Sequence, residues 1–212
     1  MIEPARQRRK SARPGELSAA ALALFVEKGF AATRLEEIAA RAGVSKGTLY
    51  LYFDSKEALF TAAIRDGIVP QLESAAARMS ALQDDPEGML REILSACWSQ
   101  IGSSEFGGIP KVMIAEAKNF PEVARFYYEH VIVPGRLLVE RAIKRGIETG
   151  VFREVDVELT ASLFFAPAMH LSVWKHSLAF CEVCQQDPEG FLDNFLEIFL
   201  RGLRAPRQGT PE

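Results

Sequence analysis

Apolar residues recur at intervals of three and four along most of the chain, and alternating, strand-like runs are absent. The first such run has apolar residues at positions 17, 20, 21, 24 and 25, which is the spacing of one face of a helix. Pro14 and Gly15 precede it, and proline is tolerated in the first turn of a helix. Gly29 follows it and is well suited to end the helix. We therefore predict a first helix from about Pro14 or Gly15 to Gly29, after a polar segment at residues 1–13.

A second, shorter helix is indicated by its two ends. Thr33 and Glu36 form a T-x-x-E pattern, which is typical of a capping box at a helix start. Gly43 stands where this helix is expected to stop. The second helix is therefore predicted between Thr33 and Gly43.

Ser45, two residues later, is expected to cap a third helix that runs to about Leu51. Asp54 gives the next cap signal and starts a fourth helix, which Pro70 is expected to kink or shorten. Two short helices joined by a tight turn predict a helix-turn-helix unit at residues 34–53. In such units the second helix enters the major groove of DNA.

The rest of the chain is also predicted to be helical. Asp85 and Asp187 each precede a Pro-Glu pair, which combines an N-cap, a first-turn proline and an acidic start. Asp156 provides a further cap. We expect the last two long helices at about residues 156–180 and 188–203.

These elements predict an all-α protein with an N-terminal three-helix helix-turn-helix domain and a larger helical domain of about nine helices. A content of 48% hydrophobic residues is enough for a real core. The expected boundaries are 1–13 for a flexible basic arm, 14–60 for the helix-turn-helix domain, 61–204 for the larger domain and 205–212 for a tail.

The formal charge of −3 conceals an asymmetry along the chain. Residues 1–56 hold ten Lys and Arg and six Asp and Glu, so 10 − 6 = +4, and the remainder holds 15 − 22 = −7. A basic front on an acidic body indicates a polyanionic partner for the front alone. Residues 1–13 are either a solvated, disordered tail or an arm that touches DNA phosphates or a minor groove.

Several classes of protein are disfavoured. No apolar run approaches the roughly 20 residues that span a bilayer, and no apolar signal core follows the basic N-terminus, so we expect a cytoplasmic protein with no membrane partner. Cys181 and Cys184, with His176 nearby, lack the second pair that a structural zinc site needs. No nucleophile–base set, phosphate-binding loop or H-E-x-x-H motif occurs. We expect no metal, no cofactor and no enzymatic activity.

The third helix carries side chains suited to DNA. Lys46 brings a positive charge that can reach a phosphate or a guanine, and Gly47 permits close approach of the backbone. Thr48 offers both a hydroxyl and a methyl group. Tyr50 and Tyr52 carry phenolic hydroxyls, which commonly donate to phosphates.

The alternative is that residues 50–53 belong to the core. We assign Leu49 and Phe53 to the core and the two tyrosines to DNA, because one face cannot bury four large consecutive residues. Lys56, at the start of the fourth helix, is expected to clamp the DNA backbone. Thr33 and Arg34 are expected to do the same from the start of the second helix.

The span from about Leu17 to Ile64 resembles the DNA-binding domain of the tetracycline-repressor (TetR/AcrR) family of bacterial regulators. The matching stretches are Ala21–Phe25, Lys28–Phe30, Thr33, Glu37–Ala39, Ala42–Tyr50 and Phe53–Leu59. The family pattern often has His where this chain has Tyr52. The resemblance implies DNA contacts from Thr33, Arg34, Ser45, Lys46, Gly47, Thr48, Tyr50, Tyr52 and Lys56.

The resemblance further implies a homodimer that binds a palindromic operator, usually as a repressor. In such proteins a small-molecule inducer bound in the helical body moves the connecting helix and spreads the two reading heads. A dimer bundle is accordingly expected from the last two long helices, although packing within one subunit is the alternative. The expected interface residues are Phe164, Ala168, Leu171, Phe191, Phe195 and Phe199.

For a small lipophilic effector, aromatic and apolar residues with a few polar groups describe a typical site, although they equally describe any helical core. The candidates are Trp98, Phe106, Met113, Glu116, Phe126, Tyr127, Met169, His170 and Trp174. The leading hypothesis is therefore a ligand-responsive repressor. A DNA-binding regulator controlled by a protein partner is the second, and an architectural DNA protein is disfavoured because the basic charge is confined to the front.

Overall fold

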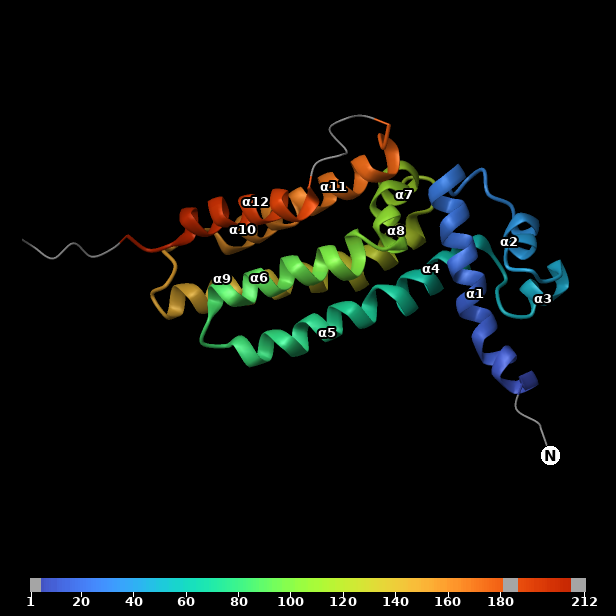
Figure 1. The fold of residues 1–212 in the computed structure, drawn as a ribbon, viewed down its shortest axis with the longest axis horizontal. Helices are drawn as coiled ribbons and strands as arrows, with labels where there is room; N and C mark the ends of the chain where they lie inside the picture. Colours follow the sequence, from blue (N-terminus) through green and yellow to red (C-terminus); the bar gives the residue numbers. More distant parts are fainter. Residues whose placement is uncertain (1–4, 181–186, 207–212) are drawn as a thin grey trace, which may run out of the picture.

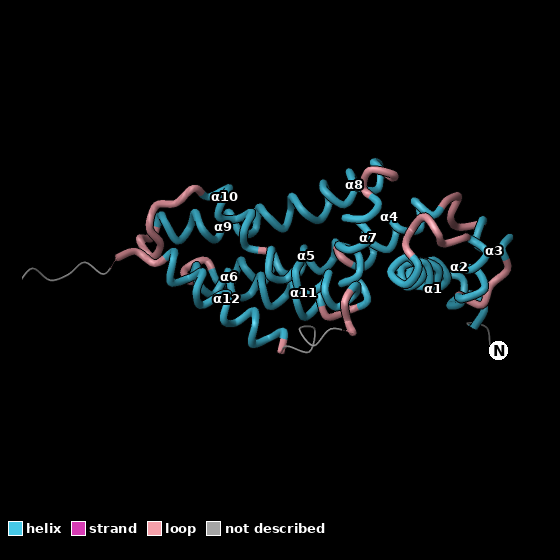
Figure 2. The backbone as a smooth tube through the Cα atoms, turned by 90° about the horizontal axis from the view of Figure 1, so that it is seen from above, coloured by secondary structure: helices cyan, strands magenta, loops and turns pink. Residues whose placement is uncertain are grey.

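The computed structural model describes residues 5–180 and 187–206, with side chains from Pro14 onward. A small helical head lies at one end of an elongated helical body (Figure 1). The head is built from α1 (Ala5–Lys28), α2 (Leu35–Arg41), α3 (Lys46–Tyr50) and the start of α4 (Lys56–Gly67). In Figure 2 α1 is seen almost end-on, so it lies across the long axis of the body.

The body is a bundle of eight α-helices. They are α5 (Val69–Met79), α6 (Pro86–Ala96), α7 (Ile109–Glu116), α8 (Pro121–Tyr127), α9 (Val133–Glu148), α10 (Val157–Phe164), α11 (Ala166–Ser177) and α12 (Pro188–Leu203). Two π-helical segments, Cys97–Gly102 and Tyr128–Ile132, extend α6 and join α8 to α9. Short 3₁₀ turns lie at Ser80–Leu82 and Glu105–Gly108. The predicted all-α class is confirmed, and the described residues hold a single antiparallel bridge, Phe152 to Arg204, instead of a sheet.

The first helix starts earlier than the sequence pattern predicts. α1 begins at Ala5 and contains Pro14, so residues 5–13 are helical instead of forming a flexible arm. This segment has no apolar periodicity, but it is rich in Ala, Arg, Gln and Lys, which favour a helix. The predicted tail is also shorter, because the amide of Ala205 donates to the carbonyl of Val151 (3.0 Å). Residues 207–212 lie outside the described part.

Two helix caps differ from the prediction. α2 begins after Arg34, whose amide donates to Glu37 Oε2 (3.1 Å), instead of using Thr33 and Glu36. α4 is capped by Ser55, whose hydroxyl oxygen accepts from the Ala58 amide (3.1 Å), instead of by Asp54. Several cap types satisfy the same free amides, so a sequence with adjacent candidates does not decide between them.

The other predicted caps are confirmed. The hydroxyl oxygen of Ser45 accepts from the Thr48 amide at the start of α3 (3.1 Å). Asp85, Asp156 and Asp187 cap α6, α10 and α12. The long helix expected from Asp156, however, is divided at Phe165 into α10 and α11, because Pro167 in the first turn of α11 has no amide to continue the ladder.

One aromatic cluster joins the head to the body. The rings of Phe25 and Phe30 lie 4.7 Å apart between centroids, and Phe60 of α4 packs edge-on against both. Phe120, just before α8, packs on the other side of Phe30 at 4.3 Å. Phe25, Phe30 and Phe60 are fully buried, and Ile109 of α7 belongs to the same core. The head and this part of the body therefore share one core.

Two polar contacts reinforce this joint. Glu116 Oε1, at the end of α7, accepts from the amide of Ala31 in the loop between α1 and α2 (3.2 Å). Lys111 Nζ donates to the carbonyl of His176 at the end of α11 (2.6 Å) and to that of Val26 in α1 (3.4 Å). The orientation of the head thus depends on α7 and α11 as well as on the α4 connection.

We expect Gly108→Ala to loosen this joint. A Cβ at Gly108 would lie 2.3 Å from Cγ2 of Val26, so α1 and the turn before α7 would have to separate. The expected loss of unfolding free energy is about 1–3 kcal/mol, as for other overpacked sites. Urea denaturation measures it.

Gly15→Ala in α1 is the matched control, because nothing lies within 4 Å of a Cβ there. It should gain up to about 1 kcal/mol from better helix propensity. Equal stabilities of the two variants would contradict the packing of α1 on the body.

Candidate DNA-binding surface and effector region

The helix α3 presents most of the side chains predicted to contact DNA. Ser45, Lys46 and Gly47 are exposed at its start, and Thr48 is half-buried with its hydroxyl 2.9 Å from that of Ser45. The Tyr50 side chain is 43% exposed. The head therefore holds a short helix with its polar face outward, anchored by a buried side chain, Leu49, on the other face.

Lys46 is held by an ion pair across the helix-turn-helix. Its Nζ lies 2.5 Å from Glu36 Oε1 on α2, with both side chains more than half exposed, and 5.8 Å from the centroid of the Tyr50 ring. The hydrogen bond to Glu36 raises the pKa of Lys46, and the hydrogen bond from Lys46 lowers the pKa of Glu36. Both groups are thus charged at neutral pH, and Lys46 is already partnered on the surface that is expected to meet DNA.

Thr33 has a structural role that differs from the prediction. Only 1% of this residue is exposed, and its hydroxyl donates to the carbonyls of Gly29 (2.8 Å) and Leu24 (3.3 Å). It therefore fastens the end of α1 to the start of α2 and offers DNA no side chain. A Thr beside a cap pattern looks the same in sequence whether its hydroxyl points inward or outward.

Lys56 is also used within the head. Its Nζ donates to the carbonyls of Phe30 (2.8 Å) and Ala31 (3.1 Å) and lies 5.0 Å from the centroid of the Phe30 ring. These contacts hold the loop between α1 and α2 against the start of α4. Lys56 is thus a brace for the head, where the sequence indicated a clamp on DNA.

The run of large residues after α3 is divided between the core and the surface. Phe53 packs against the head core as predicted, but Tyr52 packs there too, while Leu51 is 80% exposed beside Tyr50. Sequence reasoning therefore missed Leu51 as a candidate contact. The turn that ends α3 could have indicated this exposure, because residues in a turn no longer follow the helical period that places apolar residues on a buried face.

A surface hollow of about 420 Å³ adjoins Tyr50 where the starts of α2 and α4 meet. It is lined by Ala31, Thr33, Arg34, Leu35, Glu36, Tyr50, Asp54, Ser55, Lys56 and Glu57. Arg34 is exposed on it. Backbone amides of two helix starts and a guanidinium suit a phosphate group, but three carboxylates line the same hollow.

The positive charge of the front lies in the first turns of α1. Residues 14–57 contain five Lys and Arg and six Asp and Glu, so 5 − 6 = −1, whereas residues 1–13 contain five Arg and Lys and one Glu, so 5 − 1 = +4. Residues 14–57 are therefore close to neutral in sum, and the attraction for a polyanion resides in the first turns of α1, because Glu3 is the one charged side chain among residues 1–4.

The predicted effector residues do not form one cluster. Trp98 and Met113 are buried, in different cores, whereas Met169 and His170 lie on the outer surface of α11 and do not line an interior site. The ring of His170 lies near those of Trp174 (4.9 Å) and Phe191 (5.9 Å). Met169 and His170 are accordingly corrected to surface positions.

Glu116 is likewise committed to the head, through its bond to the Ala31 amide, and is not free to anchor an effector.

Phe106 and Phe126 contact the connecting helix α4. The ring of Phe106 lies so close to Gly67 that a Cβ there would be 2.1 Å from it, and the guanidinium of Arg65 lies 5.7 Å from the centroid of the Phe126 ring. Tyr127 follows directly, and burial raises the pKa of its hydroxyl. These candidates therefore lie where a change in the body would reach α4.

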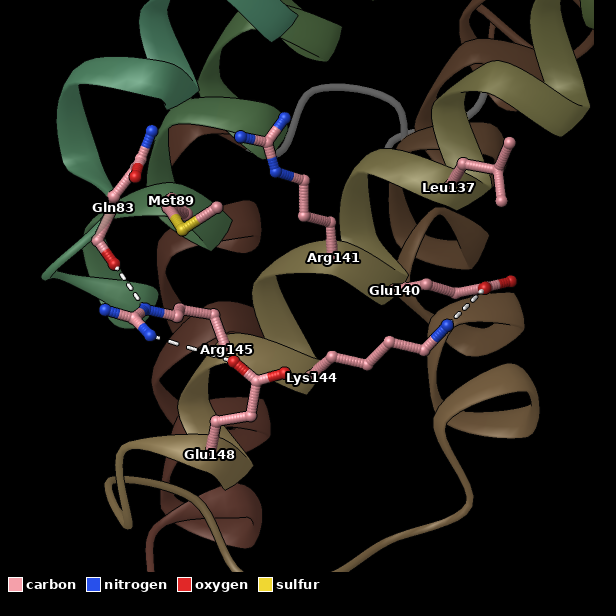
Figure 3. A pocket seen from close by; sticks show the side chains of 8 residues that line it. All are labelled: Gln83, Met89, Leu137, Glu140, Arg141, Lys144, Arg145 and Glu148. Atoms are coloured by element: carbon pink, nitrogen blue, oxygen red, sulfur yellow. Dashed lines mark hydrogen bonds and ion pairs between the residues drawn. The ribbon is translucent and has the colours of Figure 1, made fainter.

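The pocket shown in Figure 3 involves none of the predicted effector residues. It is a surface hollow of about 410 Å³, far from the head, lined by Gln83, Met89, Leu137, Glu140, Arg141, Lys144, Arg145 and Glu148. Lys144 pairs with Glu140 (3.5 Å), and Arg145 donates to the carbonyl of Gln83 (3.0 Å). Its charged groups largely satisfy one another.

The expected interface residues are more buried within the protomer than predicted. Phe164 and Ala168 belong to the body core, and Phe195 and Phe199 of α12 pack edge-on against Phe164, with ring centroids 6.1 and 5.4 Å away. Phe191 and Leu171 are half-buried against the same core. The apolar side chains that α10–α12 expose are instead Leu159, Leu163, Met169 and Ile198.

Comparison with known proteins places this architecture in a class. The model of the tetR family of bacterial regulatory proteins matches residues 17–63, which cover the head. The model of the C-terminal domain of AefR-like transcriptional repressors matches residues 88–203 of the body. The chain belongs to the tetR family and is a DNA-binding transcription regulator and not an enzyme; within that family its body is of the AefR-like type.

Individual relatives agree with this assignment. The transcriptional repressor KstR2 of Rhodococcus jostii is 31% identical over 93% of this chain and 94% of its own length. The fatty acid degradation regulator FadR of Bacillus halodurans has the same fold, with a TM-score of 0.76 and 21% identity over 92% of this chain and 97% of its own. FadR of Bacillus subtilis, solved with stearoyl-CoA, has a TM-score of 0.66 and 19% identity over 89% and 98% of the two chains.

The remaining expectations concern membrane spans and metal sites. None of the described helices is long and apolar enough to cross a membrane. Within the described ranges no group of three His, Cys, Asp or Glu side chains is arranged to hold a metal. Cys181 and Cys184 lie outside those ranges.

We expect Thr33→Val to reduce stability without removing a DNA contact. The substitution leaves the carbonyls of Gly29 and Leu24 without their hydroxyl donor, which should lower the unfolding free energy by about 1–3 kcal/mol. Operator affinity, measured well below the melting temperature, should stay within about twofold of wild type, a change that corresponds to less than ~0.5 kcal/mol.

Thr48→Val is the matched control, since it removes a hydroxyl from the half-exposed surface of α3. It should change stability by no more than about 0.5 kcal/mol while weakening operator binding. If Thr33→Val instead weakened operator binding and left stability unchanged, Thr33 would be a DNA contact as the sequence predicted.

Proposed function

We propose that this protein is a ligand-responsive repressor that binds a palindromic operator as a homodimer and is released by a small lipophilic inducer. The observation that carries the proposal is the position of α3, whose exposed Lys46 and Tyr50 stand on a head that shares a core with the body. The proposed DNA contacts are Arg34, Ser45, Lys46, Gly47, Thr48 and Tyr50, with Leu51 as an apolar neighbour. Tyr52 contributes at most its remaining exposed edge.

A test of the reading surface requires an operator, which selection from a pool of random duplexes supplies. Lys46→Ala and Tyr50→Ala should each weaken binding to the selected duplex by about 1–3 kcal/mol. The loss of a phosphate contact also reduces the salt slope by about one. Arg153→Ala, at the far end of the body, serves as the control cation. If neither α3 variant changed the affinity for the selected duplex, α3 would not be part of the DNA interface.

The proposed dimer face is formed by the exposed apolar residues of α10–α12. Leu159 and Leu163 lie one turn apart on α10, and Ile198 is exposed on α12, which packs against α10 through Phe164. A two-fold operator needs a two-fold protein, and this face supplies apolar surface for a second copy.

Leu163→Asp should yield monomers and weaken operator binding at least roughly tenfold, since one head then reads one half-site. Sedimentation velocity and a mobility shift measure the two effects. Ile114→Asp is the matched control, because Ile114 of α7 is equally exposed, at 66% against 63%, but lies outside this face. Leu163 is preferable to Phe195, whose ring also supports the core. A dimer that withstands Leu163→Asp would place the interface elsewhere.

The proposed effector region is the part of the body around Trp98, Phe106, Phe126 and Tyr127. Trp98 lies in one π-helical segment and Tyr127 directly precedes the other, and such segments are frequent at functional sites. Burial raises the pKa of the Cys97 thiol, beside Trp98 in sequence, to about 12. The stearoyl-CoA bound to FadR of Bacillus subtilis supports a lipophilic class of effector.

Coupling to the head is proposed to run through α4. A molecule that displaces Phe106 or Phe126 would press on Gly67 or Arg65, and α4 carries that shift to Phe60 in the shared core. Control by a protein partner is the alternative, and it predicts operator release without any effect of small molecules.

Tryptophan fluorescence separates these alternatives, because the chain has two tryptophans, Trp98 and Trp174. Stearoyl-CoA and free fatty acids are the first probes. An effector in the proposed region should perturb the emission of the Trp174→Phe protein, which retains Trp98, far more than that of Trp98→Phe, and should release the operator. Equal perturbation of both variants would place the effector elsewhere in the body.

A further inference from the structure

The cations near α3 are almost all engaged within the protein. Around the hollow beside Tyr50, Lys56 is bonded to two carbonyls and Lys46 is paired with Glu36. Arg34 is exposed on this hollow, and Asp54 and Glu57 line the same surface. Positive and negative side chains are thus nearly balanced on the surface that is proposed to contact DNA phosphates.

The pair between Glu36 and Lys46 has no evident role in holding the fold. Both side chains are more than half exposed, 54% and 56%, and exposed ion pairs contribute little to stability. The helix-turn-helix is held instead by buried Ile38, Ala39 and Leu49. Glu36 therefore matters less for stability than for DNA binding, because it pairs with Lys46 and repels an approaching polyanion.

We propose that Glu36 is a specificity-determining residue. Its ion pair keeps Lys46 from binding the phosphates of random duplexes and breaks only when Lys46 contacts the operator. On a random duplex, a phosphate must compete with the carboxylate for Lys46 and also approach the negative charge of Glu36. On the operator, a correctly placed guanine or phosphate gives Lys46 a better partner, and the other contacts of α3 offset the loss of the ion pair. This inference rests on the proposed function.

The distribution of charge along the chain supports this proposal. The net charge of +4 in residues 1–13 supplies attraction to any duplex, while residues 14–57, with −1, add none. Attraction without sequence preference thus comes from one segment and discrimination from another. Glu36 is the acid on the reading surface that touches a cation of the reading helix itself.

Glu36→Gln tests the proposal, with operator and random duplexes titrated by fluorescence anisotropy over a range of salt concentrations. The variant should bind the random duplex roughly three- to tenfold more tightly at low salt, with a salt slope steeper by about 0.9, because Lys46 then meets a phosphate and releases one more counterion. Operator affinity should rise less, so the ratio of operator affinity to random-duplex affinity should fall by roughly twofold or more.

Glu27→Gln is the matched control. Glu27 forms an ion pair of the same kind with Arg41 (2.7 Å, both side chains about half exposed), but with no residue of α3. It should leave the affinity ratio unchanged. In combination with Lys46→Gln, Glu36→Gln should lose most of its effect on the random duplex, because only the direct repulsion between Glu36 and the phosphates then remains.

An unchanged ratio in Glu36→Gln, an equal fall in Glu27→Gln, or an undiminished effect in the Lys46→Gln background would each overturn the assignment of Glu36 while leaving the proposed function intact. A wild-type protein that prefers no duplex over any other would instead refute the proposed function, and this inference with it.

Discussion

The packing of Phe30 between Phe25, Phe60 and Phe120 is the contact on which the arrangement of the whole molecule depends. It brings together α1, the following loop, the connecting helix α4 and the start of α8. Because interiors are close-packed, these elements cannot shift independently, and a change in one must be accommodated by the others. The head is therefore an extension of the body core and not a separate domain on a flexible linker.

This shared core explains why several polar residues at the joint between head and body bind backbone groups of the protein. Lys56 and Glu116 bind the backbone of the loop that carries Phe30, and Lys111 ties α1 to α11. Each of these residues has a chemistry that suits DNA or an effector as well as it suits a joint. Because Lys56 is bonded within the head, Lys46 is a principal cation near α3, and this makes its pairing with Glu36 consequential for the proposed DNA selection.

The two ends of the proposed signalling route meet at α4. Phe106 and Phe126 contact it from the body, and Phe60 joins it to the aromatic cluster in the head. Helices α10 and α12, which expose apolar side chains, lie along the opposite edge of the bundle from α5 (Figure 1). In the proposed dimer, each α4 would then transmit a change in its own body to a head whose spacing is fixed by the partner.

The sequence by itself determined the all-α class, the position of the helix-turn-helix, the family and four of the helix caps, because periodicity and caps are local properties. Only the tertiary structure decided that Thr33 is buried, that Lys56 braces a loop, that Phe164 and Ala168 belong to the core and that Leu51 is exposed. Whether a polar or apolar side chain faces a neighbour or solvent depends on elements distant in sequence. The pattern marks which residues can make a contact, and packing selects the contact they make.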